Sequence, residues 1–451
     1  MVHLSRLSPA PGTAPPRSPL RRVVVVCHQY PPWALGGLAE YAQRFVQCVQ
    51  RERDDVSLTL YTLNCPANLP RRERHGSVTI RRPWLPSRLK RRIVAPKNHL
   101  ALSGRALFAL SLLAFNLATL PALVRARRSG TVVAVHDWQS APAGILAATV
   151  LRLPVVYHVH NTEMTMVEQP DMTDPFRLIE INQRLLAKVA AQTVVPTPEL
   201  RRLVVAHGWR ADRISVIPHG CETTDTPAGR DPDDAKLARE RERARSGLRA
   251  ELGLPPDTPL LVFAGRLSPV KGVPTLLHAL PAVARRHPGV HLVMLGVGLA
   301  GTDQGTAVDR LVTELGIGDR THVYHRYLPQ EDVRRHYLAA DACVFPSRYE
   351  PFGLVSVEAM ALAAPVVLGS GFSALISDGE DDGGPAALRM SGDTPDELAA
   401  LICRLLDDPA AAARLAARGR THARRNFRWP GTVTRTLGLY ESLTRRKSSR
   451  G

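Results

Sequence analysis

The 451-residue chain contains no uninterrupted apolar run of the ~18 residues that a helix needs to cross a bilayer. The nearest run, "ALFALSLLAFNLATL" at 106–120, is too short and contains Asn116, so we expect a buried helix there. The first residues have no apolar core of signal-peptide type, and their Pro, Ser and Arg content predicts a disordered tail over 1–20. We therefore expect a cytoplasmic protein.

Cysteine pairs at metal-binding spacing are missing too. The six cysteines are scattered and none belongs to a C-x-x-C pair. This distribution argues against a zinc site or a disulfide framework and fits a reducing cytoplasm.

Lysine is scarce although the chain is strongly basic. Six of the 59 basic residues are lysine, and the formal net charge is +18. The segment 71–92, "RRERHGSVTIRRPWLPSRLKRR", is densely basic. It can be a plain solvated surface, a peripheral contact with the inner face of an anionic membrane, or a contact for an anionic acceptor. No nucleic-acid recognition motif accompanies the charge, so no nucleic-acid partner is expected.

The length suggests two or three domains, and the order of elements indicates two α/β halves. In the first half, "RRVVVVCHQY" reads as a buried parallel strand, followed by a glycine loop and an apolar pattern at helical spacing. Further strands of this half are predicted at 131–136, 153–160, 191–196 and 213–220. The second half repeats the strand–loop–helix order with "PLLVFAGRLSPVKG", "GVHLVMLGVG", "RTHVYHRYLP", "ACVFPSRYEPFG" and "APVVLGS".

These patterns predict two Rossmann-like domains with a cleft between them, and ligands in such sheets sit at the carboxyl ends of the strands. We place the first domain at 21–222 and the second, nucleotide-binding domain at 258–430. Between them, 223–257 is a charged linker with a solvent-exposed helix. The last helix, within 431–451, is expected to cross back to the first domain.

Two cations of the second half are candidates for binding a diphosphate. Arg266 follows a strand, and Lys271 lies in the loop that leads into a helix. Fixed cations beside a helix N-terminus suit a diphosphate, although an ordinary surface Arg and Lys on such a loop would look the same.

The stretch "EPFGLVSVE" strengthens that interpretation. Gly353 lets the backbone approach a ligand, and the N–H groups of Phe352, Gly353 and Leu354 begin a helix. Glu350 can accept hydrogen bonds from sugar hydroxyls, and Glu358, about one turn into the helix, from a ribose diol. The two carboxylates then serve different parts of one nucleotide-sugar. The alternative is a surface carboxylate plus an ordinary helix residue.

Six segments in order resemble the family 4 glycosyltransferases, retaining enzymes of GT-B fold that include bacterial glycogen synthases. They are "YPPWALGGLAEYAQRF", "VHDWQSAPAGI", "YHVHNTE", "IPHG", "GRLSPVKG" and "YEPFGLVSVEAMA", and the resemblance spans about residues 21 to 445. It implies an α/β protein with two Rossmann-like domains facing across a deep cleft, and a hexosyltransferase activity.

The resemblance also implies roles on the donor side. Arg266 and Lys271 would neutralise the donor diphosphate, Glu350 would hold the donor sugar, and Glu358 would hold the ribose. No separate cofactor is implied, because the nucleotide-diphosphate sugar, expected to be UDP- or GDP-linked, is itself the substrate.

For the first domain, Gly36 and Gly37 would form a loop that closes over the phosphates. His160 is the better match for the histidine that contacts the transferring sugar, whereas His158 can equally be a structural neighbour. Asp137 lies where the family lines the acceptor side, and a helix N-cap is its alternative role.

The residues near the proposed donor site include no D-x-D motif, so a metal-held diphosphate is not indicated. Charge on the leaving group would be stabilised by Arg266, Lys271 and helix N-terminal amides. We expect front-side displacement through an oxocarbenium-like state, with a leaving phosphate oxygen taking the acceptor proton, as the family is thought to use.

Two departures from the family matter. Glycogen synthases carry a lysine just before the glycine pair, where this chain has Ala34 and Leu35, which weakens a glucan-polymerising assignment. The segment 369–387 also departs from the usual "GG-x-P-E" pattern, so no contacts are carried over for it.

We expect transfer of a hexosyl-type sugar to a hydroxyl of a small-molecule or lipid-linked acceptor. The carboxylate-rich segment 161–180 can face a cationic acceptor such as an aminocyclitol, whereas 71–92 favours an anionic one. The alternatives are a glucan-synthase-like polymerising transferase, a GT-B nucleotide-sugar epimerase and a non-enzymatic binding protein. The donor base, the sugar and the acceptor stay open at this point.

Overall fold

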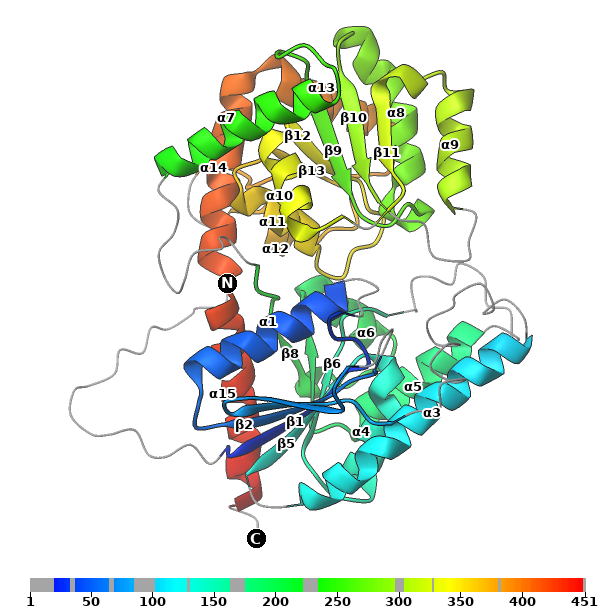
Figure 1. Ribbon diagram of the computed structural model, residues 1–451, viewed down its shortest axis with the longest axis vertical. Coiled ribbons are helices and arrows are strands. Elements are labelled where there is room, and N and C mark those ends of the chain that lie inside the picture. The colour runs from blue at the N-terminus through cyan, green and yellow to red at the C-terminus, as the bar shows by residue number, and fades with distance from the viewer. Residues whose placement is uncertain are drawn as a thin grey trace, which may run out of the picture.

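The protein is described here by a computed structural model that covers residues 20–32, 37–64, 69–84, 102–127, 130–162, 175–221, 234–296, 304–326, 328–379 and 383–448. Its strands form two separate sheets, one above the other in Figure 1. We call the part built on the first sheet the N-lobe and the part built on the second sheet the C-lobe. The expected α/β architecture with two Rossmann-like halves is confirmed.

The N-lobe sheet has eight strands, and every neighbouring pair is parallel except β3 with β4. In spatial order they are β3 (Arg72–His75), β4 (Val78–Arg81), β2 (Ser57–Tyr61), β1 (Arg22–Val26), β5 (Thr131–His136), β6 (Val155–His158), β7 (Gln192–Val195) and β8 (Ile214–Val216). The register places His136 beside His158 at the carboxyl ends of β5 and β6. This edge of the sheet therefore collects histidines from neighbouring strands.

Helices cover both faces of the N-lobe sheet, which explains why its central strands are apolar on both sides. The helices and 3-10 turns are α1 (Gly37–Glu52), α3 (Leu102–Arg125), η2 (Trp138–Ser140), α4 (Ala141–Thr149), α5 (Pro175–Val189), α6 (Pro198–Ala206), η4 (Ala211–Arg213) and α15 (Trp429–Ser448). On one face, Val23 and Val25 pack with residues of α1 and α15. On the other, Val24 and Val26 pack with residues of α3, α4 and α5.

The C-lobe sheet has six parallel strands. In spatial order they are β11 (Thr321–Tyr324), β10 (His291–Leu295), β9 (Leu260–Ala264), β12 (Ala342–Phe345), β13 (Val366–Leu368) and β14 (Leu388–Arg389). Its helices and 3-10 turns are α7 (Asp234–Glu251), η5 (Pro269–Lys271), α8 (Val273–Arg286), α9 (Gln304–Glu314), η6 (Gly318–Arg320), α10 (Gln330–Ala339), α11 (Leu354–Ala361), α12 (Ala374–Ser377), α13 (Pro395–Asp407) and α14 (Pro409–Asn426).

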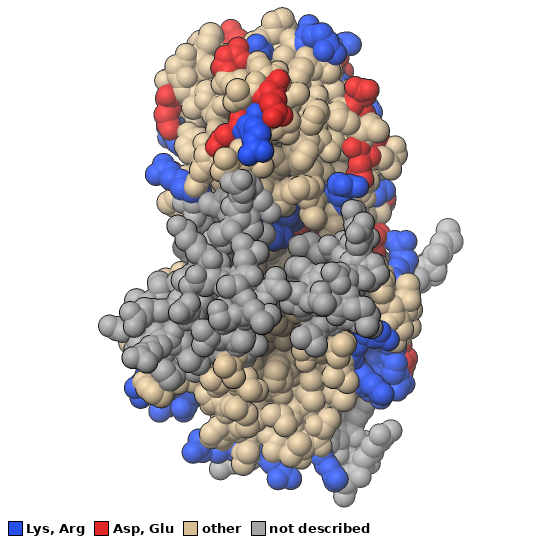
Figure 2. Space-filling model, turned by 90° about the vertical axis from the view of Figure 1, so that its right-hand side faces the viewer, with Lys and Arg blue, Asp and Glu red and all other residues tan. Residues whose placement is uncertain are grey.

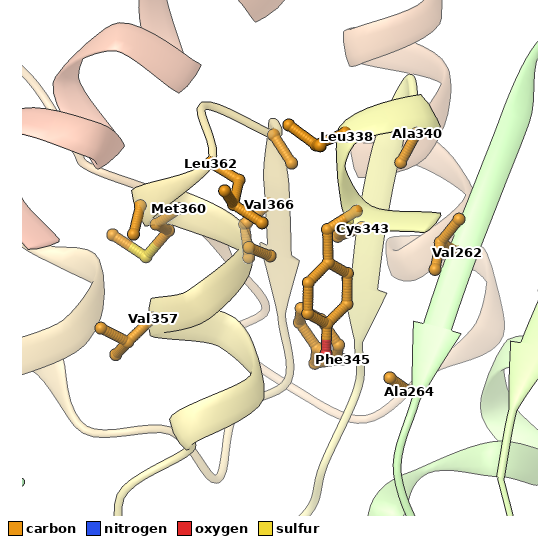
Figure 3. Close-up of a cluster of buried hydrophobic side chains, with 14 of the residues drawn as sticks. Val262, Ala264, Leu338, Ala340, Cys343, Phe345, Val357, Met360, Leu362 and Val366 are labelled. Carbon is orange, nitrogen blue, oxygen red and sulfur yellow. The ribbon is translucent and has the colours of Figure 1, made fainter. Parts of the chain in front are cut away.

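Alternate residues of the C-lobe strands face two different cores. Val262 and Phe345 point toward α10 and α11, where Met360 and Leu362 complete a buried cluster (Figure 3). Leu261, the residue before Val262 in β9, faces the opposite core with residues of α8 and α13. The sheet is thus fixed on both sides, and the loops at its carboxyl edge start from rigid strand ends.

The last helix ties the C-terminal end of the chain to the N-lobe. In Figure 1, α15 runs down from the C-lobe along the N-lobe. The hydroxyl of Tyr440 lies 2.6 Å from Nε2 of His158, and Arg53 of the α1 end pairs with Glu441 at 2.9 Å.

The sequence missed part of the N-lobe sheet. No strand is expected within the basic segment 71–92, yet its described part, 71–84, contains β3 and β4 at one side of the sheet. Strand β2 was not predicted either. These strands are short, β3 has no apolar residue, and β4 alternates apolar residues with polar ones. The rest of 71–92 lies outside the described residues.

The expectation of a buried helix at 106–120 is only half right. Helix α3 buries Leu112, Phe115 and Asn116 but leaves Leu110, Leu113 and other apolar side chains exposed. No helix of the described residues is long and apolar enough to span a bilayer.

Candidate functional site

The loops after β9 and β12 bring two of the predicted donor-site residues into direct contact. Nζ of Lys271 lies 2.6 Å from Oε2 of Glu350, and both side chains are mostly buried. Oγ of Ser347 lies 3.5 Å from the same carboxylate oxygen. Arg266, half-buried, occupies the same edge of the sheet two residues after β9. A cation and a carboxylate from distant parts of the sequence thus meet where parallel strands end, the usual ligand position in such sheets.

Two glycines allow these loops to come so close. Gly272 has φ 71°, and a Cβ there would lie 1.9 Å from the carbonyl oxygen of Pro346. Gly353 has φ 94°, and a Cβ there would lie 2.3 Å from the ring of Phe372. Both positions require glycine for its positive φ and its missing side chain.

In the turn before α11, the side chain of Phe352 is buried in packing contacts. The backbone amides of the turn are therefore the groups that can bind a ligand. Phe352 is 2% exposed, and its ring lies 4.9 Å from His219 and 5.5 Å from Phe427. Gly353 then forms the N-cap of α11, which begins at Leu354. The N-terminal amides of a helix attract oxygen ligands and negative charge, so this turn can hold hydroxyl or phosphate oxygens.

Glu358 lies on α11, one turn beyond Leu354, and is half-buried. It lies near the phenol of Tyr337: burial raises the pKa of Tyr337 well above its ordinary value, and the charge of Glu358 raises it further. Glu350 and Glu358 therefore lie before and within the same helix, as the sequence predicted from their spacing.

The N-lobe contributes a cluster of buried rings at the carboxyl edge of its sheet. We define the histidine cluster as four imidazoles: His136, His158, His160 and His219. The first two are the last residues of β5 and β6, and the other two lie in the loops after β6 and β8. Nδ1 of His136 lies 2.9 Å from Nε2 of His160. The ring of Tyr41 from α1 lies 4.5 Å from His160 and 4.7 Å from His219.

These histidines are uncharged at neutral pH. Burial lowers the pKa of His136 and of His219 to about 3. Burial also lowers the pKa of His160 well below its usual value, and the neighbouring imidazoles lower it further. A neutral ring has one N–H donor and one acceptor, so the 2.9 Å contact between His136 and His160 needs one of each.

Of the histidine cluster, the sequence analysis singled out His160 and His158 alone. The signal for His136 and His219 was present, since each lies in the last residues of a predicted strand, within "VHDW" and "IPHG". What was missing was the strand order, which places the ends of β5 and β6 side by side. Tyr41 gave no sequence signal beyond its place on an amphipathic helix.

Asp137 positions the loop that carries His160. Its Oδ1 accepts hydrogen bonds from the N–H of His160 at 2.7 Å and the N–H of Asn161 at 3.4 Å. Its backbone has φ 55°, an uncommon conformation for a residue other than glycine. Asp137 occupies the N-cap position of η2, as its alternative role predicted, but its side chain makes no capping hydrogen bond there. An acceptor-side role for Asp137 stays a prediction.

The two lobes touch around the turn at 351–353, directly before α11, which we call the donor turn. His219 of the N-lobe packs on Phe352, and Oγ1 of Thr197 donates to the carbonyl oxygen of Pro351 at 3.0 Å. At the start of α1, a Cβ on Gly37 would lie 3.2 Å from Cδ1 of Leu354. The predicted residues Gly37 and Leu354 therefore lie side by side, whereas Gly36 lies outside the described residues.

The divergent segment 369–387 packs against the backbone of the loop that follows β12. Cβ atoms on Gly369 and Gly371 would lie within 2.4 Å of the backbone of Ser347 and Arg348. Ser373, in the same segment, hydrogen-bonds Glu199 of the N-lobe. Residues 380–382 lie outside the described part of the chain.

Two family models match, one on each lobe. Residues 36–220 match the model of a glycosyl transferase 4-like domain, and residues 245–422 match the model of glycosyl transferases group 1.

Curated relatives extend this match over most of the chain. The D-inositol 3-phosphate glycosyltransferase of Xylanimonas cellulosilytica is 33% identical over 324 residues, which cover 71% of this chain and 73% of that protein. The protein of the same name from Thermomonospora curvata is 31% identical and covers 68% and 70% of the two chains.

Solved structures share the fold at lower identity. Sucrose-phosphate synthase from Thermosynechococcus elongatus has a TM-score of 0.71 and 21% identity, covering 94% of this chain and 99% of that one. The catalytic domain of starch synthase IV from Arabidopsis thaliana, bound to ADP and acarbose, has a TM-score of 0.71 and 16% identity, covering 95% and 100%. Both support the two-lobed architecture of the chain.

Proposed function

The chain belongs to the group 1 glycosyltransferases, and from that premise we propose that it transfers a hexosyl-type sugar with retention from a nucleotide-diphosphate donor to a hydroxyl of a small, phosphorylated cyclitol. One observation carries the proposal. The donor turn of the C-lobe, which follows Glu350 of the Lys271–Glu350 pair, lies against the histidine cluster of the N-lobe through the contact between His219 and Phe352.

On the donor side, each C-lobe group suits one part of a nucleotide-sugar. Arg266 and Lys271 supply positive charge for the diphosphate, and the amides at the start of α11 supply hydrogen-bond donors. Glu350 accepts from hydroxyls of the donor sugar, and Glu358 accepts from the ribose. Lys271 and Glu350 contact each other at 2.6 Å, so a bound donor shares or replaces that contact.

The transfer step needs stabilisation of the charge that develops on the leaving diphosphate. Arg266, Lys271 and the α11 amides supply it from fixed positions, which costs little reorganisation during the reaction. The bond from the anomeric carbon to the leaving oxygen breaks while the acceptor oxygen adds on the same face. The acceptor proton passes to the leaving phosphate oxygen, so no side chain has to act as the base.

His160 is well placed to contact the transferring sugar. It lies beside His219, with ring centroids 5.0 Å apart, and His219 packs on the donor turn. As a neutral imidazole, His160 can exchange a hydrogen bond with a sugar hydroxyl without placing a positive charge beside an oxocarbenium-like centre.

The acceptor assignment rests on the curated relatives. Several proteins between 30% and 33% identical to this chain carry the name D-inositol 3-phosphate glycosyltransferase. A phosphorylated cyclitol is also anionic, which suits a chain of net charge +18. This choice replaces the cationic aminocyclitol that segment 161–180 allowed.

The test combines ligand binding with a transfer assay. Thermal unfolding is followed with UDP, GDP, ADP and dTDP, where a ligand at 100 times its Kd adds ~2.7 kcal/mol to the free energy of unfolding. The nucleotide-sugar that contains the stabilising nucleotide is then incubated with the protein in three separate reactions: with inositol 3-phosphate, with unphosphorylated inositol, and without an acceptor. The anomeric configuration of the product is determined by NMR.

We expect one nucleotide to stabilise the protein and transfer to occur to the phosphorylated cyclitol with the donor's anomeric configuration. Transfer to unphosphorylated inositol at an equal rate would contradict the acceptor assignment. An inverted product would contradict the mechanism, and growth of a glucan chain would favour the polymerising alternative.

A further inference from the structure

The exposed large apolar side chains of the described residues all belong to the N-lobe, and seven of the eight lie on one layer of helices. The eight are Trp84, Leu110, Leu113, Leu117, Val124, Val150, Ile181 and Leu185. All but Trp84 belong to α3, α5 or the C-cap of α4. We call these seven the apolar face. Helices α3 and α5 both pack on α4, so the apolar face belongs to one contiguous layer.

Helix α3 is apolar on two sides, which a helix at an ordinary protein surface is not. Its inner side buries Phe115 and Leu123 against the sheet. Its outer side exposes Leu110, Leu113 and Leu117, at intervals of three and four residues, to between 45% and 55%. Side chains at these intervals lie on one face of a helix. The outer side is therefore a continuous apolar stripe that nothing in the described part of the chain covers.

The charges around the apolar face are mostly positive. Five exposed cations belong to α3 and α5 or to the residues that follow α3 and α4: Arg125, Arg127, Arg152, Arg184 and Lys188. Helices α3 and α4 contain no acidic residue, and in the described part of α5 the one carboxylate is Glu180, 3.8 Å from Arg184. Figure 2 shows this side of the molecule, with a broad uncharged area on the lower lobe, Lys and Arg at its margins, and most Asp and Glu on the upper lobe.

From this combination we infer that the apolar face is a docking surface for an anionic lipid bilayer. Leucine side chains that project from a helix parallel to the bilayer can enter the boundary between headgroups and acyl chains. Arg and Lys at the rim then meet anionic headgroups, and their long stems can lie along the apolar surface. A protein partner could also cover leucines, but five cations and one carboxylate among the described residues of these helices and their ends complement an anionic surface.

The apolar face is rigidly connected to the acceptor side of the proposed site. The side chain of Asn116, buried on the inner side of α3, donates to the carbonyl oxygen of Gln139 at 2.9 Å and accepts from the N–H of Ala143 at 3.0 Å. Gln139 follows Asp137 by two residues. On α5, the side chain of Gln183 donates to the carbonyl oxygen of Asn161 at 3.1 Å. Docking would thus hold the loops after β5 and β6 at a fixed position relative to the membrane surface.

The surface is distinct from the basic segment 71–92. The described part of that segment forms β3 and β4 at the far end of the sheet, three strands away from β5. The docking surface also does not depend on the identity of the donor or the acceptor, so it can be tested apart from the proposed function.

The experiment measures sedimentation of the full chain with vesicles of phosphatidylcholine, with and without phosphatidylglycerol. Leu113→Gln/Leu117→Gln removes the centre of the apolar stripe, and Trp84→Gln removes a more exposed apolar side chain outside it. Arg125→Gln/Arg127→Gln lowers the rim charge, and Arg243→Gln/Arg414→Gln makes the same change of net charge on exposed arginines of the C-lobe. Thermal unfolding and nucleotide-induced stabilisation check that each variant is folded.

We expect binding to vesicles with phosphatidylglycerol, reduced about tenfold or more by the leucine pair and weakened by salt. The rim variant should bind less well than the C-lobe variant, and Trp84→Gln should bind like the unmodified chain. Absence of vesicle binding, or binding that the leucine pair leaves intact, would overturn the inference. So would a concentration-dependent dimer that the leucine pair abolishes while vesicles have no effect, because the occupant would then be a second copy.

Discussion

Single replacements of Lys271 and of Glu350 should each lower stability, because the two side chains form an ion pair with each other. They should also show which of the two residues binds the diphosphate and which binds the sugar of the donor. Their side chains are 18% and 11% exposed and 2.6 Å apart. Lys271→Met leaves a mostly buried carboxylate, for which the described residues then offer the 3.5 Å contact to Ser347. Breaking a fully buried pair costs about 3–5 kcal/mol and an exposed pair less than about 1 kcal/mol, so we expect about 1–3 kcal/mol here.

The double variant Lys271→Met/Glu350→Gln should lose less than the sum of the two single variants, because neither charge is left alone. For domains of this size, each kcal/mol corresponds to roughly 2–4 °C in Tm, so the differences can be measured by thermal unfolding.

Ligand binding should separate the two roles. Without Glu350, Lys271 is no longer held by a carboxylate, so Glu350→Gln should bind the free nucleoside diphosphate at least as tightly as the unmodified chain while losing sugar transfer. Lys271→Met should lose nucleotide affinity and, by removing a charge-stabilising donor, transfer by about 10²-fold or more.

Titration calorimetry with the nucleotide and a transfer assay give both quantities. If Glu350→Gln weakened nucleotide binding as much as Lys271→Met does, the assignment of Glu350 to the sugar and Lys271 to the diphosphate would be refuted.

Three further changes test the turn, the histidine cluster and the acceptor-side loop. Gly353→Ala should cost about 1–3 kcal/mol, measured by urea unfolding, because φ is 94° and the new Cβ would meet the ring of Phe372; an unchanged midpoint would contradict this. Burial lowers the pKa of His136 to about 3, so its contribution to stability is complete above ~pH 6.5 and lost as the pH falls, by up to about 1.4 kcal/mol per pH unit; His136→Asn should flatten that dependence. Asp137→Ala should impair transfer by releasing the N–H of His160, whereas Asp137→Asn, which keeps an acceptor oxygen, should retain most activity; equal losses would instead indicate that the negative charge is needed.

The buried strands could be predicted because their sequences admit few alternatives. "TVVAVH" was predicted at 131–136, and β5 occupies Thr131–His136 with every residue buried. A parallel strand covered on both faces must be apolar throughout, which gives a pattern that is easy to detect. The edge strand β3 lacks it, because all four of its residues are polar, and its neighbour β4 alternates buried Val78 and Ile80 with Thr79 and Arg81.

The apolar segment at 106–120 shows where composition stops being informative. A helix with apolar residues all round was expected to be buried, yet α3 packs only one side on the sheet and exposes Leu110, Leu113 and Leu117. Which side of an apolar helix is exposed depends on how many other elements pack around it in the fold. That number cannot be predicted from the sequence of the helix alone.

The sequence by itself determined the two α/β halves, the candidate donor residues and the spacing of Glu350 and Glu358. These features depend on local order, since a glycine turn that starts a helix fixes which residues lie beside it. The tertiary structure decided the contact of Lys271 with Glu350, the ring contacts among histidines from neighbouring strand ends, and the packing of one of them, His219, on the donor turn. Those contacts join residues up to 133 positions apart, as from His219 to Phe352, and only the order of strands and the packing of one lobe on the other bring them together.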